Sequence, residues 1–92
     1  MEASTAPSKK LEVKQDIRFR LRGMRQVGHP QLRVRNMREA RDKLGMAHLS
    51  VNVFREALNS LCYSDGEVRI MRPAMMGKSD IGRPYFISLV TS

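Results

Sequence analysis

The sequence contains very little cysteine, and this scarcity limits the chemistry that it can support. Its single cysteine, Cys62, excludes an internal disulfide and any zinc cluster built on paired cysteines. No stretch approaches the roughly 18 consecutive apolar residues that a membrane span needs. Residues 1–10 are polar and lack the apolar core of a secretory signal. We therefore expect an intracellular protein of the nucleus, cytoplasm or nucleoid, with no membrane partner.

Acidic residues are also scarce relative to basic ones. Seventeen Lys and Arg face nine Asp and Glu, which gives a net charge of +8. Residues 1–35 hold nine basic and three acidic side chains, whereas residues 36–92 hold eight basic and six acidic ones. A small basic domain usually meets an anionic partner, such as nucleic acid, an acidic protein or a lipid surface. The first third of the chain is the main candidate for that contact.

The length allows one domain, because domains cluster at about 100–150 residues. Residues 1–10 are small, polar and basic, with almost nothing to bury, so we expect a disordered N-terminal arm. Residues 11–92 then form the domain.

Apolar spacing predicts a first helix over residues 12–26, ended by the sequence Gly28-His29-Pro30. One stripe of this helix carries Val13, Ile17, Leu21 and Met24.

Capping residues mark the start of two further helices. Asn36 stands three residues before Glu39, as in a capping box, and predicts a helix over residues 37–44. Ser50 caps a third helix over residues 51–63, which carries the strongest amphipathic stripe of the chain.

Alternating polar and apolar residues predict three strands, over residues 31–35, 67–72 and 85–90. The last two form a hairpin with a loop of about ten residues, and the first strand pairs with that hairpin because three strands are more stable than two. The predicted fold is α+β, a small three-helix core with a C-terminal hairpin.

The element order helix, strand, helix, helix, strand, strand resembles the winged-helix superfamily over about residues 12–91. The resemblance rests on this order and on no sequence motif. It implies that the helix over residues 51–63 enters the DNA major groove, while the hairpin loop, or wing, touches the backbone or minor groove.

Basic and amide side chains from several segments are candidate nucleic-acid contacts. Arginine binds phosphate oxygens with a planar fork, which suits the cations of residues 12–26, 31–35 and 37–44. On the third helix, Arg and Asn suit the edges of guanine and adenine. The candidates are Lys14, Arg18, Arg22, Arg25, Arg33, Arg35, Arg38, Arg41, Asn52, Arg55, Asn59, Arg72, Lys78 and Arg83.

These side chains also suit a simple structural role. In that role the arginines solvate the surface, or cover the core with the apolar stems of their side chains. The helix over residues 51–63 has no net charge because Glu56 offsets Arg55, so a solvated polar face fits it equally well. The basic surplus of residues 1–35 exceeds what solubility requires and favours binding.

Two patterns resemble catalytic signatures but lack their essential parts. Gly77-Lys78-Ser79 resembles the end of a P-loop, yet Arg72 stands where that motif needs a glycine. Cys62 lies on an apolar stripe, which is typical of a core residue, and neither His29 nor His48 is spaced as its catalytic base. We expect a non-enzymatic protein without a metal site or cofactor.

Three functions remain, and the charge favours the first, binding of nucleic acid, with double-stranded DNA ahead of RNA. The second is a protein-interaction module of a replication, transcription or ribosomal assembly, with Met75, Met76 and Ile81 as its contact surface. The third is RNA binding, although few aromatic residues are available for base stacking. The chain lacks a long free helix for dimerisation, so we expect a monomer or a subunit of a larger assembly.

Overall fold

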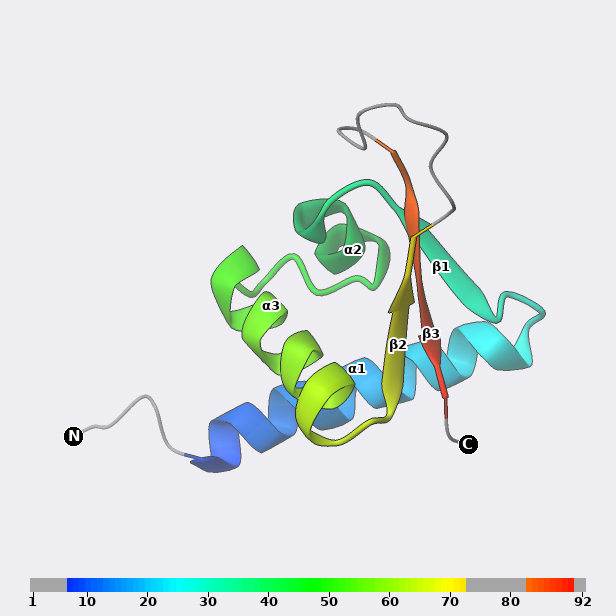
Figure 1. The fold of residues 1–92 in the computed structure, drawn as a ribbon. Coiled ribbons are helices and arrows are strands. Elements are labelled where there is room, and N and C mark those ends of the chain that lie inside the picture. Colours follow the sequence, from blue (N-terminus) through cyan, green and yellow to red (C-terminus); the bar gives the residue numbers. More distant parts are fainter. Residues whose placement is uncertain (1–6, 73–82, 91–92) are drawn as a thin grey trace.

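The protein has an α+β fold in which three helices cover one face of an antiparallel sheet, and the elements follow the predicted order (Figure 1). The computed structural model describes residues 7–72 and 83–90. The elements are α1 (Pro7–Gln26), β1 (Gln31–Val34), α2 (Met37–Lys43), α3 (Val51–Asn59), η1 (Ser60–Ser64), β2 (Val68–Met71) and β3 (Tyr85–Leu89).

Helix α1 begins earlier than predicted, at Pro7 rather than at residue 12. Proline suits the first position of a helix, since its fixed φ is helical and its missing N–H is not needed there. Residues 7–10, which we expected within the disordered arm, therefore extend the helix. The rest of the expected arm, residues 1–6, lies outside the described residues.

The predicted caps of α2 and α3 are confirmed. The Asn36 side chain accepts from the N–H of Glu39 (2.8 Å), and the Ser50 hydroxyl accepts from the N–H of Val53 (3.2 Å). The Glu39 carboxylate accepts from the N–H of Arg35 (2.7 Å), one residue before the N–H that a capping box uses. This bond ties the end of β1 to the first turn of α2.

The third helix does not remain α-helical to its predicted end at Tyr63. Its last turn, η1, is π-helical, and the N–H of Asp65 donates to the carbonyl of Ser60 (3.0 Å). The N–H of Glu67 then donates to the carbonyl of Leu61 (2.8 Å). These two bonds hold the start of β2 against the end of the helix.

The sheet has the strand order β1-β3-β2, so β3 is central and both neighbours are edge strands. Ile87 of β3 lies opposite Leu32 of β1 on one side and Ile70 of β2 on the other. This face packs on the helices, where Ile17 and Phe54 have no exposed surface, and neither has Ile87. Burying one such side chain contributes about 1.5–3 kcal/mol, so this core fixes the relative positions of all the elements.

Candidate nucleic-acid interface

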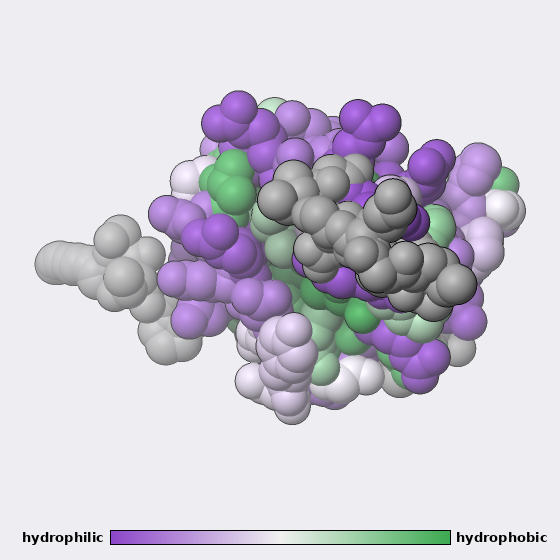
Figure 2. Space-filling model, turned by 45° about the horizontal axis from the view of Figure 1, so that its top comes forward, coloured by the Kyte–Doolittle hydropathy of each residue, from purple (hydrophilic) through white to green (hydrophobic). Residues whose placement is uncertain are grey.

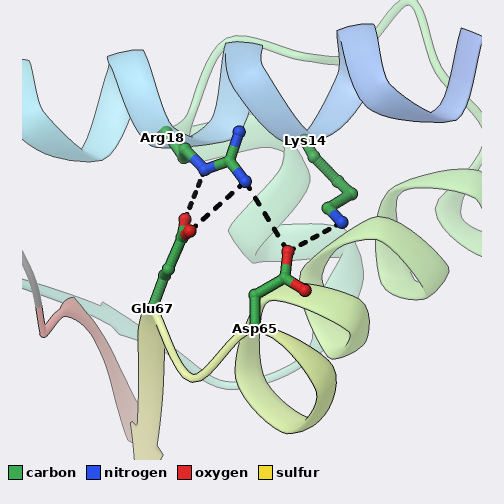
Figure 3. A network of polar contacts seen from close by, with 4 residues as sticks. All are labelled: Lys14, Arg18, Asp65 and Glu67. Atoms are coloured by element: carbon green, nitrogen blue, oxygen red, sulfur yellow. Dashed lines mark hydrogen bonds and ion pairs between the residues drawn. The ribbon is translucent and has the colours of Figure 1, made fainter. Parts of the chain in front are cut away.

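Two of the candidate contacts, Lys14 and Arg18 of α1, are engaged inside the fold (Figure 3). Lys14 Nζ lies 2.7 Å from a carboxylate oxygen of Asp65. Arg18 pairs with the Glu67 carboxylate, and its Nη2 lies 3.6 Å from Asp65. We call these four residues the α1 clamp. Their side chains are 15–29% exposed, so the clamp holds α1 against the segment between η1 and β2 and leaves little cationic surface there.

Arg41 of α2 is also used within the protein. Its guanidinium donates to the carbonyl of Leu49 (2.9 Å) and to the Asp42 carboxylate (2.8 Å), and its side chain is 17% exposed. Arg20 of α1 acts similarly, donating to the Leu44 carbonyl and to Asp16, both at 2.7 Å. These arginines join neighbouring segments, so the count of seventeen Lys and Arg overstates the number of cations that remain to bind a partner.

Other basic residues meet where the hairpin loop joins the sheet. Val34 lies opposite Tyr85, and Met71 lies opposite Phe86. The residues that follow β1 and β2 and those that precede β3 therefore lie at the same end of the sheet. The next segment, α2, starts from this end as well. We call six basic side chains of β1, of these segments and of α2 the loop-end cluster, and leave out Arg41 because it is engaged internally. The six are Arg33, Arg35, Arg38, Lys43, Arg72 and Arg83.

Part of the loop-end cluster surrounds a pocket of about 160 Å³ between β1 and α2. Arg33, Arg35 and Lys43 line it, and Glu39 is the acidic residue of its lining. Hydrogen bonding from the backbone N–H of Arg35 lowers the pKa of the Glu39 carboxyl, and Lys43 lowers it further. The carboxylate therefore remains ionised at neutral pH, and three cations face one anion. Lys43 belongs to this site although the sequence analysis missed it; its spacing of four residues from Glu39 was the available signal.

Arg72 is held at the base of the hairpin loop by an aromatic ring. Its guanidinium carbon lies 4.8 Å from the centroid of the Tyr85 ring, within the range of a cation–π contact. Burial raises the pKa of the Tyr85 hydroxyl against the opposing effect of Arg72, so this ring remains neutral. The contact positions Arg72 while leaving the residue exposed.

The remaining candidates lie apart from the loop-end cluster or outside the described residues. Arg22 and Arg25 are exposed in the last turns of α1, which lead into β1 at the end of the sheet away from the loop (Figure 1). They are therefore not part of one continuous basic surface with Arg35 and Arg72. Lys78 lies in residues 73–82, outside the described residues, as do Met75, Met76 and Ile81.

The outward face of α3 carries the polar residues that the sequence analysis assigned to it. Asn52 and Arg55 are exposed, and the Arg55 guanidinium donates to the Asn52 side chain. Asn59 is half-buried, and Glu56 is exposed on the same helix. This face offers hydrogen-bonding groups with little net charge, whereas the loop-end cluster supplies the positive charge.

Cys62 lies at the edge of the core in η1, packed against buried residues. Burial raises the pKa of its thiol to about 11, so the thiol remains protonated at neutral pH.

Among residues 7–72 and 83–90, no three His, Cys, Asp or Glu side chains gather as metal ligands. None of the helices described is both long enough and apolar enough to span a bilayer.

No family model, curated protein or solved structure matches this chain.

Proposed function

We propose that this protein is a non-enzymatic, winged-helix-like protein that binds double-stranded DNA through the loop-end cluster. The observation that carries the proposal is the strand register, which brings the ends of β1 and β2 and the start of β3, with the basic residues in and beside them, to one end of the sheet. Glu39 is the acidic residue among them in the pocket lining. A surface of this kind suits sequence-independent contact with phosphates.

Different parts of the interface have different roles in this proposal. The five arginines of the cluster bind phosphate oxygens with their planar forks, and Arg72 is positioned for this by the Tyr85 ring. Asn52 and Arg55 of α3 present amide and guanidinium groups to base edges in a groove. The α3 face has little net charge, so it adds little electrostatic affinity of its own.

Salt dependence and a matched pair of variants test the proposal. If five phosphates are neutralised, the logarithm of the affinity falls with the logarithm of salt concentration at a slope of about −4.5. The double variant Arg35→Gln, Arg38→Gln should make this slope shallower by about 1.8, since each phosphate contact contributes about 0.9. Fluorescence anisotropy of a labelled duplex, titrated at several salt concentrations, measures both quantities.

The control removes the same charge from the other end of the sheet. The double variant Arg22→Gln, Arg25→Gln should leave the salt slope close to that of the unchanged protein. Equal losses in the two double variants would show that only net charge matters, and a slope near zero in the unchanged protein would refute DNA binding. A competing structured RNA that displaces the duplex at equimolar concentration would assign the site to RNA.

A further inference from the structure

The backbone hydrogen bonds of the sheet show which groups of β2 face away from it. The N–H of Val90 donates to the carbonyl of Glu67 (2.8 Å), just before the first residue of β2. Hydrogen-bonded pairs alternate along an antiparallel ladder, so Arg69 and Met71 are the β2 residues bonded to β3. The N–H and C=O groups of Val68 and Ile70 therefore point away from β3. Val68 is only 3% exposed, whereas Ile70 is half-buried, so the outward groups of Ile70 form the accessible part of the open edge.

The two edges of the sheet differ in the hydrogen bonds that their outward backbone groups make. The same alternation turns the backbone groups of Arg33 and Arg35 outward from β1, and side chains of α2 bind two of these groups. Lys43 Nζ donates to the Arg33 carbonyl (2.9 Å), and Glu39 accepts from the Arg35 N–H (2.7 Å). Within the described residues, no such bond reaches the outward groups of Val68 or Ile70. An open edge is a template for a further strand.

A hollow of about 340 Å³ lies beside the open edge of β2. Its charged lining residue is Arg69, and its apolar lining comes from Cys62, Tyr63, Val68, Ile70 and Val90. Tyr63 is 81% exposed and Val90 is 43% exposed, although both are large apolar side chains. In the view of Figure 2, hydrophobic surface lies near the middle of the face turned toward the reader, with hydrophilic side chains around it. Its volume is at the lower end of the roughly 300–1,000 Å³ typical of ligand pockets.

We propose that β2 binds an extended segment of a partner protein in which apolar and acidic side chains alternate. Residues directly opposite each other in a sheet point to the same face. A side chain opposite Ile70 therefore points toward the helix side and enters the hollow, so it is apolar. A side chain opposite Arg69 lies on the outer face, where a carboxylate pairs with the guanidinium.

Charge distinguishes this partner from a second copy of the chain. The segment Val68–Met71 contains no acidic residue, and each copy carries a net charge of +8. The acidic neighbours Asp65 and Glu67 already pair with Lys14 and Arg18 in the α1 clamp. An acidic strand complements this edge, whereas a basic copy is repelled by it.

The test uses a displayed library of random heptapeptides selected against the full chain. We expect the enriched peptides to alternate apolar residues with Asp or Glu. In nuclear magnetic resonance titrations, the best peptide should shift the amide signal of Ile70, the accessible outward residue of β2, more than those of other residues. Methylating the backbone nitrogens that face β2 should abolish this binding, because a strand pairs through those N–H groups.

Three variants complete the test. Tyr63→Ser should weaken the peptide at least tenfold, while Phe19→Ser, which removes an exposed aromatic residue from α1, should leave its affinity unchanged. Arg69→Glu should shift the selection toward basic peptides and leave DNA binding by the loop-end cluster intact. Failure of the library to yield an enriched peptide, absence of acidic preference, or shifts away from β2 would refute the proposal. Concentration-dependent dimerisation through β2 would assign the edge to a second copy instead.

Discussion

At the scale of single residues, Glu39 limits the positive charge of the loop-end cluster. Its carboxylate accepts from the Arg35 N–H and lies 3.3 Å from Lys43 Nζ. Glu39→Gln keeps an oxygen for the Arg35 N–H and removes the negative charge, so we expect duplex affinity to rise about two- to fivefold at low salt. Anisotropy titrations measure this, with Glu12→Gln in α1 as the control. An equal rise in both variants would show that the position of the charge is unimportant.

The same residue links pH to stability. Its pKa is lowered from the ordinary value of 4.5, first by the Arg35 backbone N–H and then by Lys43. A lowered folded-state pKa means that the ionised form stabilises the fold above pH 4.5, and that this contribution is lost as pH falls through the lowered value. In urea titrations, Glu39→Gln should therefore lose less stability on acidification than the unchanged protein does.

At the scale of elements, the α1 clamp fastens the long first helix to the start of β2. Asp65→Asn removes the partner that Lys14 and Arg18 share, and we expect the free energy of unfolding to fall by about 0.5–1.5 kcal/mol. Asp42→Asn is the control, because Asp42 is half-exposed and pairs with its sequence neighbour Arg41 instead of joining two elements. Urea unfolding followed by circular dichroism compares the two. A loss at Asp42 as large as that at Asp65 would contradict the importance of the clamp.

At the scale of the whole molecule, one core supports both proposed surfaces. Ile87 is completely buried in the central strand β3, between Leu32 of β1 and Ile70 of β2. The end of β1 belongs to the loop-end cluster, and β2 carries the open edge. Ile87→Ala should lower the free energy of unfolding by about 2–5 kcal/mol, as other large-to-small core substitutions do. The urea transition should remain single, while Ile87→Val should cost only about 0.5–1.5 kcal/mol. Two separate transitions would show that the sheet and the helices do not share a core.

The sequence predicted the elements well because local patterns determine them. The stripe from Val13 to Met24 marked α1, and the caps Asn36 and Ser50 marked the starts of α2 and α3. The π-helical turn η1 was missed because it depends on how Leu61 and Glu67 connect the helix to β2. A local pattern of apolar residues does not record such a connection.

The candidate interface was only partly predictable. Arg33 and Arg35 were recognised by alternation along β1, and the structure places them beside the loop that joins β2 and β3. Counting charge along the chain could not distinguish Arg18, which is engaged in the α1 clamp, from Arg22, which is exposed. The two have the same chemistry and differ only in what lies next to them after folding.

By itself, the sequence determined the succession of helices and strands, the face of each that is buried and the excess of positive charge. Periodicity and composition are properties of neighbouring residues, so they can be read without knowing the fold. Only the tertiary structure decided which charges are used internally and which edge of the sheet stays open. Arg18 and Glu67 are 49 positions apart in the sequence, and such partners meet only when the common core brings their segments together.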